Sequence, residues 1–161
     1  MFNRKDEKRD ECMLTGGLAG LGYDWWWHSF TGHNSTTGQE KAFFIEFFVC
    51  NPASGGKDPV FGQLPENRKN GIRPSYLMVK AGSWGEDARQ LHRFFGWDSF
   101  NIQGRALFSI QAGDCHLDET STKGSVTVSQ ADASEHPEYM CQDGTMSWCM
   151  GQFRPATCFC K

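Results

Sequence analysis

The chain has 161 residues, a length that suits a single domain with one hydrophobic core. Sixteen Lys and Arg against nineteen Asp and Glu give a net charge of -3, so the composition provides no basic surface for nucleic acid or anionic lipid. The content of 39% hydrophobic and 22% charged residues excludes a disordered chain, and thirteen Phe, six Trp and eighteen Gly favour a mainly β fold of short strands and turns.

Residues 1–22 are predicted to form a charged leader followed by a glycine-rich linker. Residues 1–11 alternate charges of both signs where a secretory signal needs an apolar core, so we expect a cytoplasmic protein. Residues 16–22 resemble a nucleotide-binding glycine loop, but a Trp-rich strand follows them instead of a helix, which favours a linker. No stretch reaches the roughly 18 apolar residues of a membrane span, so none is expected.

Residues 23–149 are predicted to form one β domain. Turn-forming residues between 23–31 and 41–50 predict a β-hairpin, and the aperiodic residues 57–73 predict a long loop. A strand is expected at 76–81 and two helical turns at 85–94. An antiparallel meander should follow, with short strands at 99–103, 106–111, 115–120, 123–129 and 145–149 and a helical turn within 131–140. Residues 150–161 are aperiodic, so we expect an irregular tail and a truncated end.

The strand at 42–50 alternates so that Phe44, Glu46 and Phe48 share one face. The opposite face is apolar as well, so Glu46 is expected to lie among buried aromatic rings. Desolvation would then raise its pKa and keep it protonated near neutral pH, ready to donate a proton. The alternative is that Glu46 pairs with Lys, Arg or His on a neighbouring strand.

Three consecutive tryptophans mark the preceding strand. Trp25 and Trp27 face one way, whereas Trp26 and His28 face the other. All three cannot be core residues, so at least one is expected to line a cavity or to contact a ligand or partner. His28 is expected to pair with Glu46 across the hairpin, either as a proton-donor couple or as a structural pair.

The seven cysteines are expected to stay reduced. Their number is odd and no export signal accompanies them, which argues against a disulfide framework. The late cluster has spacings that fit no zinc template, namely Cys141, Cys149, Cys158 and Cys160. We therefore expect no metal and no cofactor. No Gly-x-Ser-x-Gly motif and no phosphate-binding loop supports hydrolase or kinase chemistry.

Several segments resemble the amino-terminal half of bacterial tocopherol-cyclase-like proteins, whose wider relatives include carotenoid hydratases. These are the aromatic strand 23–32, the apolar strand 41–52 that ends in Asn-Pro, and the segments 61–65, 80–87 and 146–148. The resemblance implies a pair of lipocalin-like (calycin-type) antiparallel barrels with an apolar cavity. It also implies proton-driven cyclisation or hydration of an isoprenoid double bond. The chain has about half the family's length, so we expect a fragment that holds the first barrel, or a strongly curved sheet.

Three functions are therefore open. The first is an intramolecular cyclase acting on a prenylated phenol, in which Glu46 and His28 are the candidate catalytic residues and aromatic faces stabilise the carbocation. The candidate substrate-binding residues are Trp25, Trp26, Trp27, Phe44, Phe48 and Trp84. The second is a module that binds a hydrophobic small molecule without chemistry. The third is an interaction fragment, and an exposed apolar face would then favour self-association.

Overall fold

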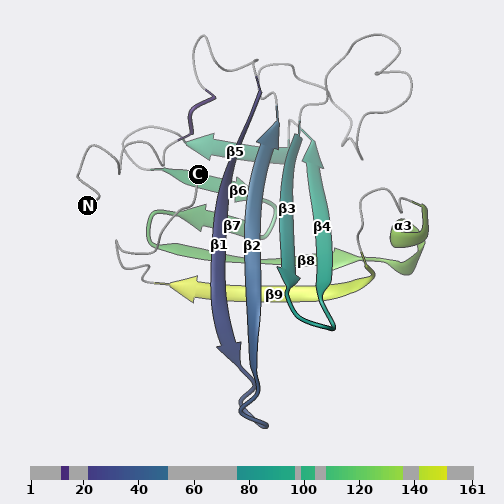
Figure 1. Ribbon diagram of the computed structural model, residues 1–161. Helices are drawn as coiled ribbons and strands as arrows, with labels where there is room; N and C mark the ends of the chain where they lie inside the picture. Colours follow the sequence, from purple (N-terminus) through teal and green to yellow (C-terminus); the bar gives the residue numbers. More distant parts are fainter. Residues whose placement is uncertain are drawn as a thin grey trace.

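Two antiparallel sheets and one short helix make up the described part of the computed structural model, which covers residues 12–14, 22–50, 76–96, 99–103, 108–135 and 142–151. The strand orders are β1-β2-β3-β4 in the first sheet and β5-β6-β7-β8-β9 in the second (Figure 1). Every neighbouring pair is consecutive in sequence, so each sheet is a meander and the prediction of a mainly β fold is confirmed. The predicted leader 1–11, residues 16–21 of the predicted linker 16–22, the loop 57–73 and the tail beyond 151 lie outside the described residues.

The first sheet contains β1 (Tyr23–His33), β2 (Glu40–Cys50), β3 (Tyr76–Ser83) and β4 (Arg89–Gly96). The predicted hairpin is confirmed, because β1 and β2 pair over their full length from Tyr23 opposite Cys50 to His33 opposite Glu40. Asn34 closes the turn: its side-chain oxygen accepts hydrogen bonds from the amides of Thr36 and Thr37, both at 2.9 Å. Gly38 then takes a φ of 70°, which a residue without Cβ adopts at little cost.

The prediction of helical turns at 85–94 is wrong, because residues 89–96 form strand β4. The acidic residues that suggested a helix start belong to a turn, in which the Ala88 amide donates to the Gly85 carbonyl at 3.2 Å. Beyond it, Leu91 and Phe95 are buried on the face that Arg93 shares. Pairing with β3 satisfies the backbone of this segment, so tertiary contacts override the local pattern.

The second sheet contains β5 (Phe100–Gln103), β6 (Ser109–Ala112), β7 (Cys115–Asp118), β8 (Ser121–Val128) and β9 (Gly144–Gly151). These strands confirm the predicted meander, although β9 continues to residue 151, inside the predicted tail. Helix α3 (Gln130–Glu135) overlaps the range 131–140 in which a helical turn was predicted and begins one residue before it. Ser129 caps it, since the Asp132 amide donates to the Ser129 hydroxyl at 3.1 Å.

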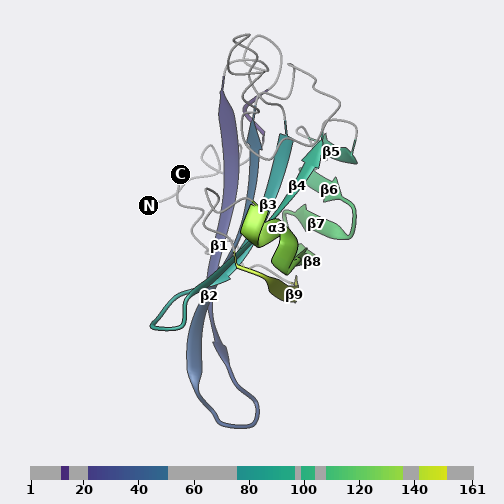
Figure 2. The ribbon, with the colours of Figure 1, turned by 90° about the vertical axis from the view of Figure 1, so that its right-hand side faces the viewer.

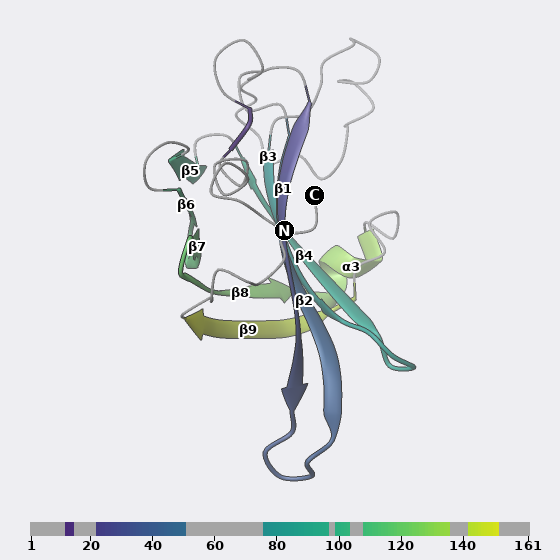
Figure 3. The same cartoon turned by 60° about the vertical axis from the view of Figure 1, so that its left-hand side comes forward.

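The core lies between the two sheets, whose strands cross (Figures 1 and 3). The largest fully buried side chains come from both sheets and include Trp26, Phe47, Leu77 and Leu91 from the first and Ile110, Leu117 and Val126 from the second. Alternating residues of each strand supply this layer, as expected for stacked sheets.

Polar contacts of β4 hold one side of the two sheets together. Arg93 donates to the carboxylate of Asp114 at 2.5 Å and to the Ser125 carbonyl at 3.3 Å. The Gln142 amide donates to the Gln90 carbonyl at 2.9 Å, and Arg89 donates to the carbonyl of Asp143. On the other side, the β1–β2 hairpin extends past β9 (Figure 2).

No helix within the described residues is both long and apolar enough to cross a membrane.

Replacing Gly82 by Ala is expected to lower the free energy of unfolding by about 2 kcal/mol, a typical cost of overpacking. An added Cβ would contact the ring of Phe44 and would lie 2.6 Å from the carbonyl oxygen of Arg89, which belongs to the backbone and yields little. Urea unfolding of the full chain measures the difference. Gly151→Ala is the matched control, because a Cβ there has no atom within 4 Å. Equal unfolding midpoints for the two variants would contradict the expectation.

Candidate functional site

Five of the six predicted substrate-binding residues lie together on the outer face of the first sheet, which points away from the second sheet. The register of β1 and β2 places Trp25 opposite Phe48 and Trp27 opposite Glu46 on this face. We call the surface the aromatic face and define it by Tyr23, Trp25, Trp27, Phe44, Phe48, Tyr76, Trp84 and Phe94. Trp26 is the exception, since it is buried between the sheets and stacks on Phe108 at 5.0 Å.

Phe44 is the best packed ring of the aromatic face. It stacks on Trp27 with the ring centroids 4.8 Å apart and the planes within 8°, and Trp84 lies 4.9 Å away on a tilted plane. Gly82 on the neighbouring strand leaves space for this ring, because a Cβ at that position would collide with it. Phe44 is consequently only 2% exposed although it lies on an outer face. Trp84 is 42% exposed and borders the same group.

A polar row crosses the middle of the aromatic face. The registers of the four strands align Trp27, Glu46, Lys80 and His92 side by side. The Lys80 ammonium lies 3.6 Å from a Glu46 carboxylate oxygen and 5.8 Å from the centre of the Phe44 ring. Burial raises the pKa of Glu46, while the positive charge of Lys80 opposes this rise. The alternative of an ion pair with a neighbouring strand is thus confirmed for Glu46.

The expected pairing of His28 with Glu46 is wrong. His28 lies opposite Ile45 on the inner face, whereas Glu46 lies opposite Trp27 on the outer face, so the sheet separates the two side chains. His28 is 6% exposed, and burial lowers its pKa to about 4, so it is neutral at pH 7. His28 therefore contributes to the core and does not orient Glu46.

Lys80 and His92 were missed as site residues. Lys80 stands in a strand that the sequence predicts, but only the register of β2 and β3 places it beside Glu46. His92 was assigned to a helical turn, which removed it from the sheet. Burial, and to a smaller extent the neighbouring Lys80 charge, together lower the pKa of His92 to about 4, so His92 is a neutral member of the row.

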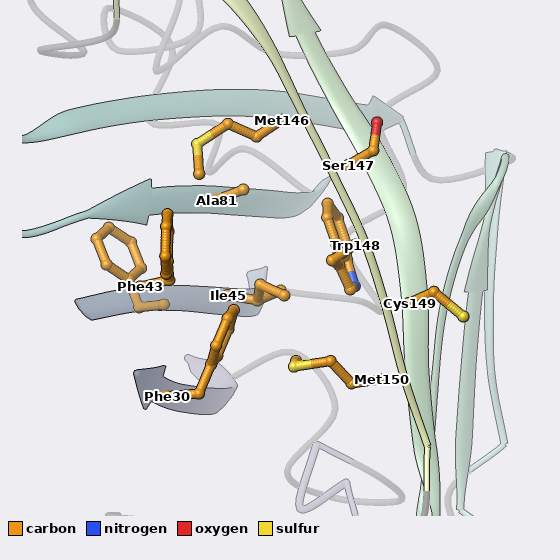
Figure 4. Close-up of a pocket in the computed structure, with 10 residues that line it drawn as sticks. Phe30, Phe43, Ile45, Ala81, Met146, Ser147, Trp148, Cys149 and Met150 are labelled. Atoms are coloured by element: carbon orange, nitrogen blue, oxygen red, sulfur yellow. The ribbon is translucent and has the colours of Figure 1, made fainter. Parts of the chain in front are cut away.

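A second candidate site is a pocket of about 310 Å³ between the inner face of the first sheet and β9. Its walls are formed by Phe30, Phe43, Phe44, Ile45, Ala81, Met146, Ser147, Trp148, Cys149 and Met150. Figure 4 shows the side chains of Met146, Trp148 and Met150 directed towards the first sheet, whereas Ser147 and Cys149 point away. No charged residue is among those that line the pocket.

Alternation along β9 and one anchored indole build this pocket. The Trp148 ring nitrogen donates to the Thr122 hydroxyl at 3.0 Å, and that hydroxyl donates to the His116 carbonyl at 2.8 Å. Gly124 allows the indole to lie against β8, since a Cβ there would be 2.9 Å from the ring. The polar end of Trp148 is thus satisfied within the sheet, and its apolar surface is available to the pocket.

The cysteines and histidines give no sign of metal chemistry in the described residues, where no three His, Cys, Asp or Glu side chains form a cluster that would hold an ion. Cys115 and Cys149 are thiols. Burial raises the pKa of Cys115 to about 11, so this thiol is protonated and unreactive at neutral pH. Cys141, Cys158 and Cys160 lie outside the described residues.

Comparisons with protein-family models, with curated proteins and with solved structures give no match for the chain.

The buried His28 is expected to make stability depend on pH. Its pKa of about 4 in the folded protein lies below its ordinary value of 6.5, so the unfolded chain binds more protons between these values. The free energy of unfolding should therefore be highest above pH 6.5 and fall as the pH is lowered towards 4, by about 3 kcal/mol for this group. Urea unfolding at a series of pH values measures the slope.

His28→Phe removes the titrating group and keeps a ring of similar size in the core. This variant is expected to reduce the dependence between pH 6.5 and 4 by about half of the histidine contribution while it unfolds cooperatively at pH 7.5, because His92, whose pKa is also lowered to about 4, keeps its own share. An unchanged slope would show that His28 is not the group responsible.

Proposed function

We propose that this protein binds a neutral, apolar small molecule in the pocket between its two sheets and acts as a lipocalin-like ligand-binding module. The observation that carries this proposal is the lining of the pocket, which combines phenylalanine, isoleucine, methionine and tryptophan with no charged residue. A volume of about 310 Å³ is at the lower end of the range typical of small-molecule sites.

The chemistry of the lining defines the class of ligand. A fatty acid would bring a carboxylate into a site with no cation among its lining residues, and the cost of desolvating that charge would not be recovered. An uncharged polyene or prenyl chain has no such cost. It would contact the thioethers of Met146 and Met150 and the rings of Phe30 and Phe43.

The arrangement of the strands supports the same proposal. Two consecutive antiparallel meanders that enclose a core are compatible with a calycin-type barrel, in which the interior holds one small ligand. In this interpretation the two sheets are the two halves of one barrel.

Acid-catalysed cyclisation of a prenylated phenol is the second candidate. It is favoured by Glu46, a carboxyl group of raised pKa that lies beside the rings of Trp27 and Phe44. In this mechanism the carboxyl proton would add to an alkene carbon, and the rings would stabilise the resulting cation. The phenol oxygen would then close the new ring and its proton would return to the Glu46 carboxylate. Two features make it weaker: Glu46 is paired with Lys80, and it lies on the opposite face of the sheet from the pocket.

Met150→Trp is expected to fill part of the pocket and to weaken binding of all-trans-retinol, a neutral fluorescent polyene, at least about tenfold, or about 1.4 kcal/mol. Fluorescence titration of the full chain measures the dissociation constant. The matched control is Thr127→Trp, which adds the same side chain at an exposed position of the second sheet. Parinaric acid, an anionic polyene, should bind more weakly than retinol to the wild-type chain. Equal retinol affinities for both variants would reject the pocket as the site.

Incubation with a prenylated hydroquinone separates the two candidates. The binding proposal expects no cyclised product by mass spectrometry and chromatography. A cyclised product that disappears in Glu46→Gln would favour the cyclase instead, provided that this variant still binds retinol as the wild type does.

A further inference from the structure

The outer faces of the two sheets differ in chemistry. The outward-facing positions of the second sheet are polar, and include Asn101, Gln103, Gln111, His116, Lys123, Thr127, Thr145 and Ser147. Those of the first sheet form the aromatic face. Figure 1 views the molecule from this side, and Figure 2 shows that the second sheet and α3 do not lie over it. Water solvates the polar outer face of the second sheet well, whereas the aromatic face of the first sheet resembles a surface that packs against protein.

We propose that the aromatic face is the interface through which two copies of this chain form a symmetric dimer. The two-fold axis would run parallel to the strands, in the plane of the interface, midway between β2 and β3. Within one chain, each residue of β2 has an antiparallel partner on β3. The axis places each β2 residue of one copy over the corresponding β3 residue of the other copy. Dimers of this kind are isologous, since the same patch is used twice.

Charge complementarity supports this axis. Glu46 and Lys80 are register neighbours on β2 and β3, so the operation puts Glu46 of each copy over Lys80 of the other. The two existing ion pairs would become a closed square of alternating charges. An axis perpendicular to the strands through the same row would put Glu46 over Glu46, which like-charge repulsion disfavours.

The same axis also brings apolar residues of the two copies into contact. The same operation places Phe44 over Gly82 and Phe48 over Met78. At one end Ala42 would face Trp84, whose amide donates to the Ala42 carbonyl at 3.0 Å within the chain and so fixes their common row. The dimer would thus bury Phe48, Met78 and Trp84 of the two copies against one another, which adds apolar contact area to the charge contacts.

The extent of the face is sufficient for a reversible dimer. Four strands at about 4.8 Å spacing and about eight residues at 3.3 Å each give a flat area of about 500 Å² per copy, or about 1,000 Å² in total. This is near the lower limit for a specific interface. We therefore expect association that depends on concentration.

A second copy suits the polar row better than a lipid surface or an apolar ligand. Lipid tails would cover Glu46 and Lys80 without offering either a counter-charge, and such desolvation is unfavourable. In the dimer, Lys80 of the second copy supplies a counter-charge to Glu46, and Glu46 of the second copy supplies one to Lys80.

Mixing two charge-reversed variants tests the interface. Glu46→Lys alone and Lys80→Glu alone should each be monomeric, because each homodimer would bring like charges together across the interface. A one-to-one mixture should dimerise, since every facing pair across its interface is then opposite in charge. The pair within each chain stays like-charged in the mixture, so recovery reports contacts between copies. Sedimentation velocity over a concentration series measures all three, with melting temperatures to verify folding.

A variant that leaves the ion pair intact provides a second test. Ala42→Glu should weaken dimerisation at least about tenfold, because its carboxylate would be desolvated against the Trp84 ring of the second copy, whereas Thr127→Glu on the polar face should not. A wild-type chain that stays monomeric at the highest soluble concentration would overturn the proposal. A one-to-one mixture of the charge-reversed variants that stays monomeric while both variants fold would also overturn the proposal. This holds as well if the aromatic face is then found to bind a hydrophobic dye or lipid vesicles.

Discussion

Strand β2 is apolar on both faces, and the structure depends on covering both of them. Ile45, Phe47 and Val49 point into the core, where the second sheet covers them. Phe44 and Phe48 point the other way, where only rings from the neighbouring strands β1 and β3 and the loop after β3 pack against them in the described residues. A strand of this composition is typical of sheets buried on both sides. The ion pair of Glu46 with Lys80 is the polar exception, and it is placed where the outer rings already exclude part of the solvent.

The two candidate sites follow from this division. The pocket lies between the inner side of the first sheet and β9. The methionines and the tryptophan of β9 line this space but do not fill it. On the outer side, aromatic rings surround the polar row that contains Glu46 and Lys80. The two surfaces are separated by the thickness of one sheet. A ligand in the pocket and a partner on the aromatic face would therefore contact opposite sides of the same strand, with Phe44 belonging to both surfaces.

Alternation within single strands was predictable from the sequence, and relations between distant strands were not. The period of two in residues 23–31 and 42–50 correctly assigned each tryptophan and each phenylalanine to a face. The register did not follow from it, so His28 was paired with Glu46 although they lie on opposite faces. The helix predicted at 85–94 failed because its acidic residues serve a turn and because β3 provides hydrogen bonds that no local pattern reveals. Most residues that line the pocket could not be predicted for the same reason, since Ile45 and Trp148 are far apart in sequence and meet only when the sheets cross.

The thioethers in the pocket wall would connect the proposed ligand binding to oxidation chemistry. Met146 and Met150 are half-buried on β9 and face the first sheet. Conversion of either sulfur to a sulfoxide would introduce a strong dipole into a lining of otherwise hydrocarbon and aromatic surface. A neutral polyene would lose affinity for that wall, while the polar contacts of β4 that hold the sheets together would be untouched. Oxidation would thus weaken the proposed ligand binding, and methionine sulfoxide reductases would restore it.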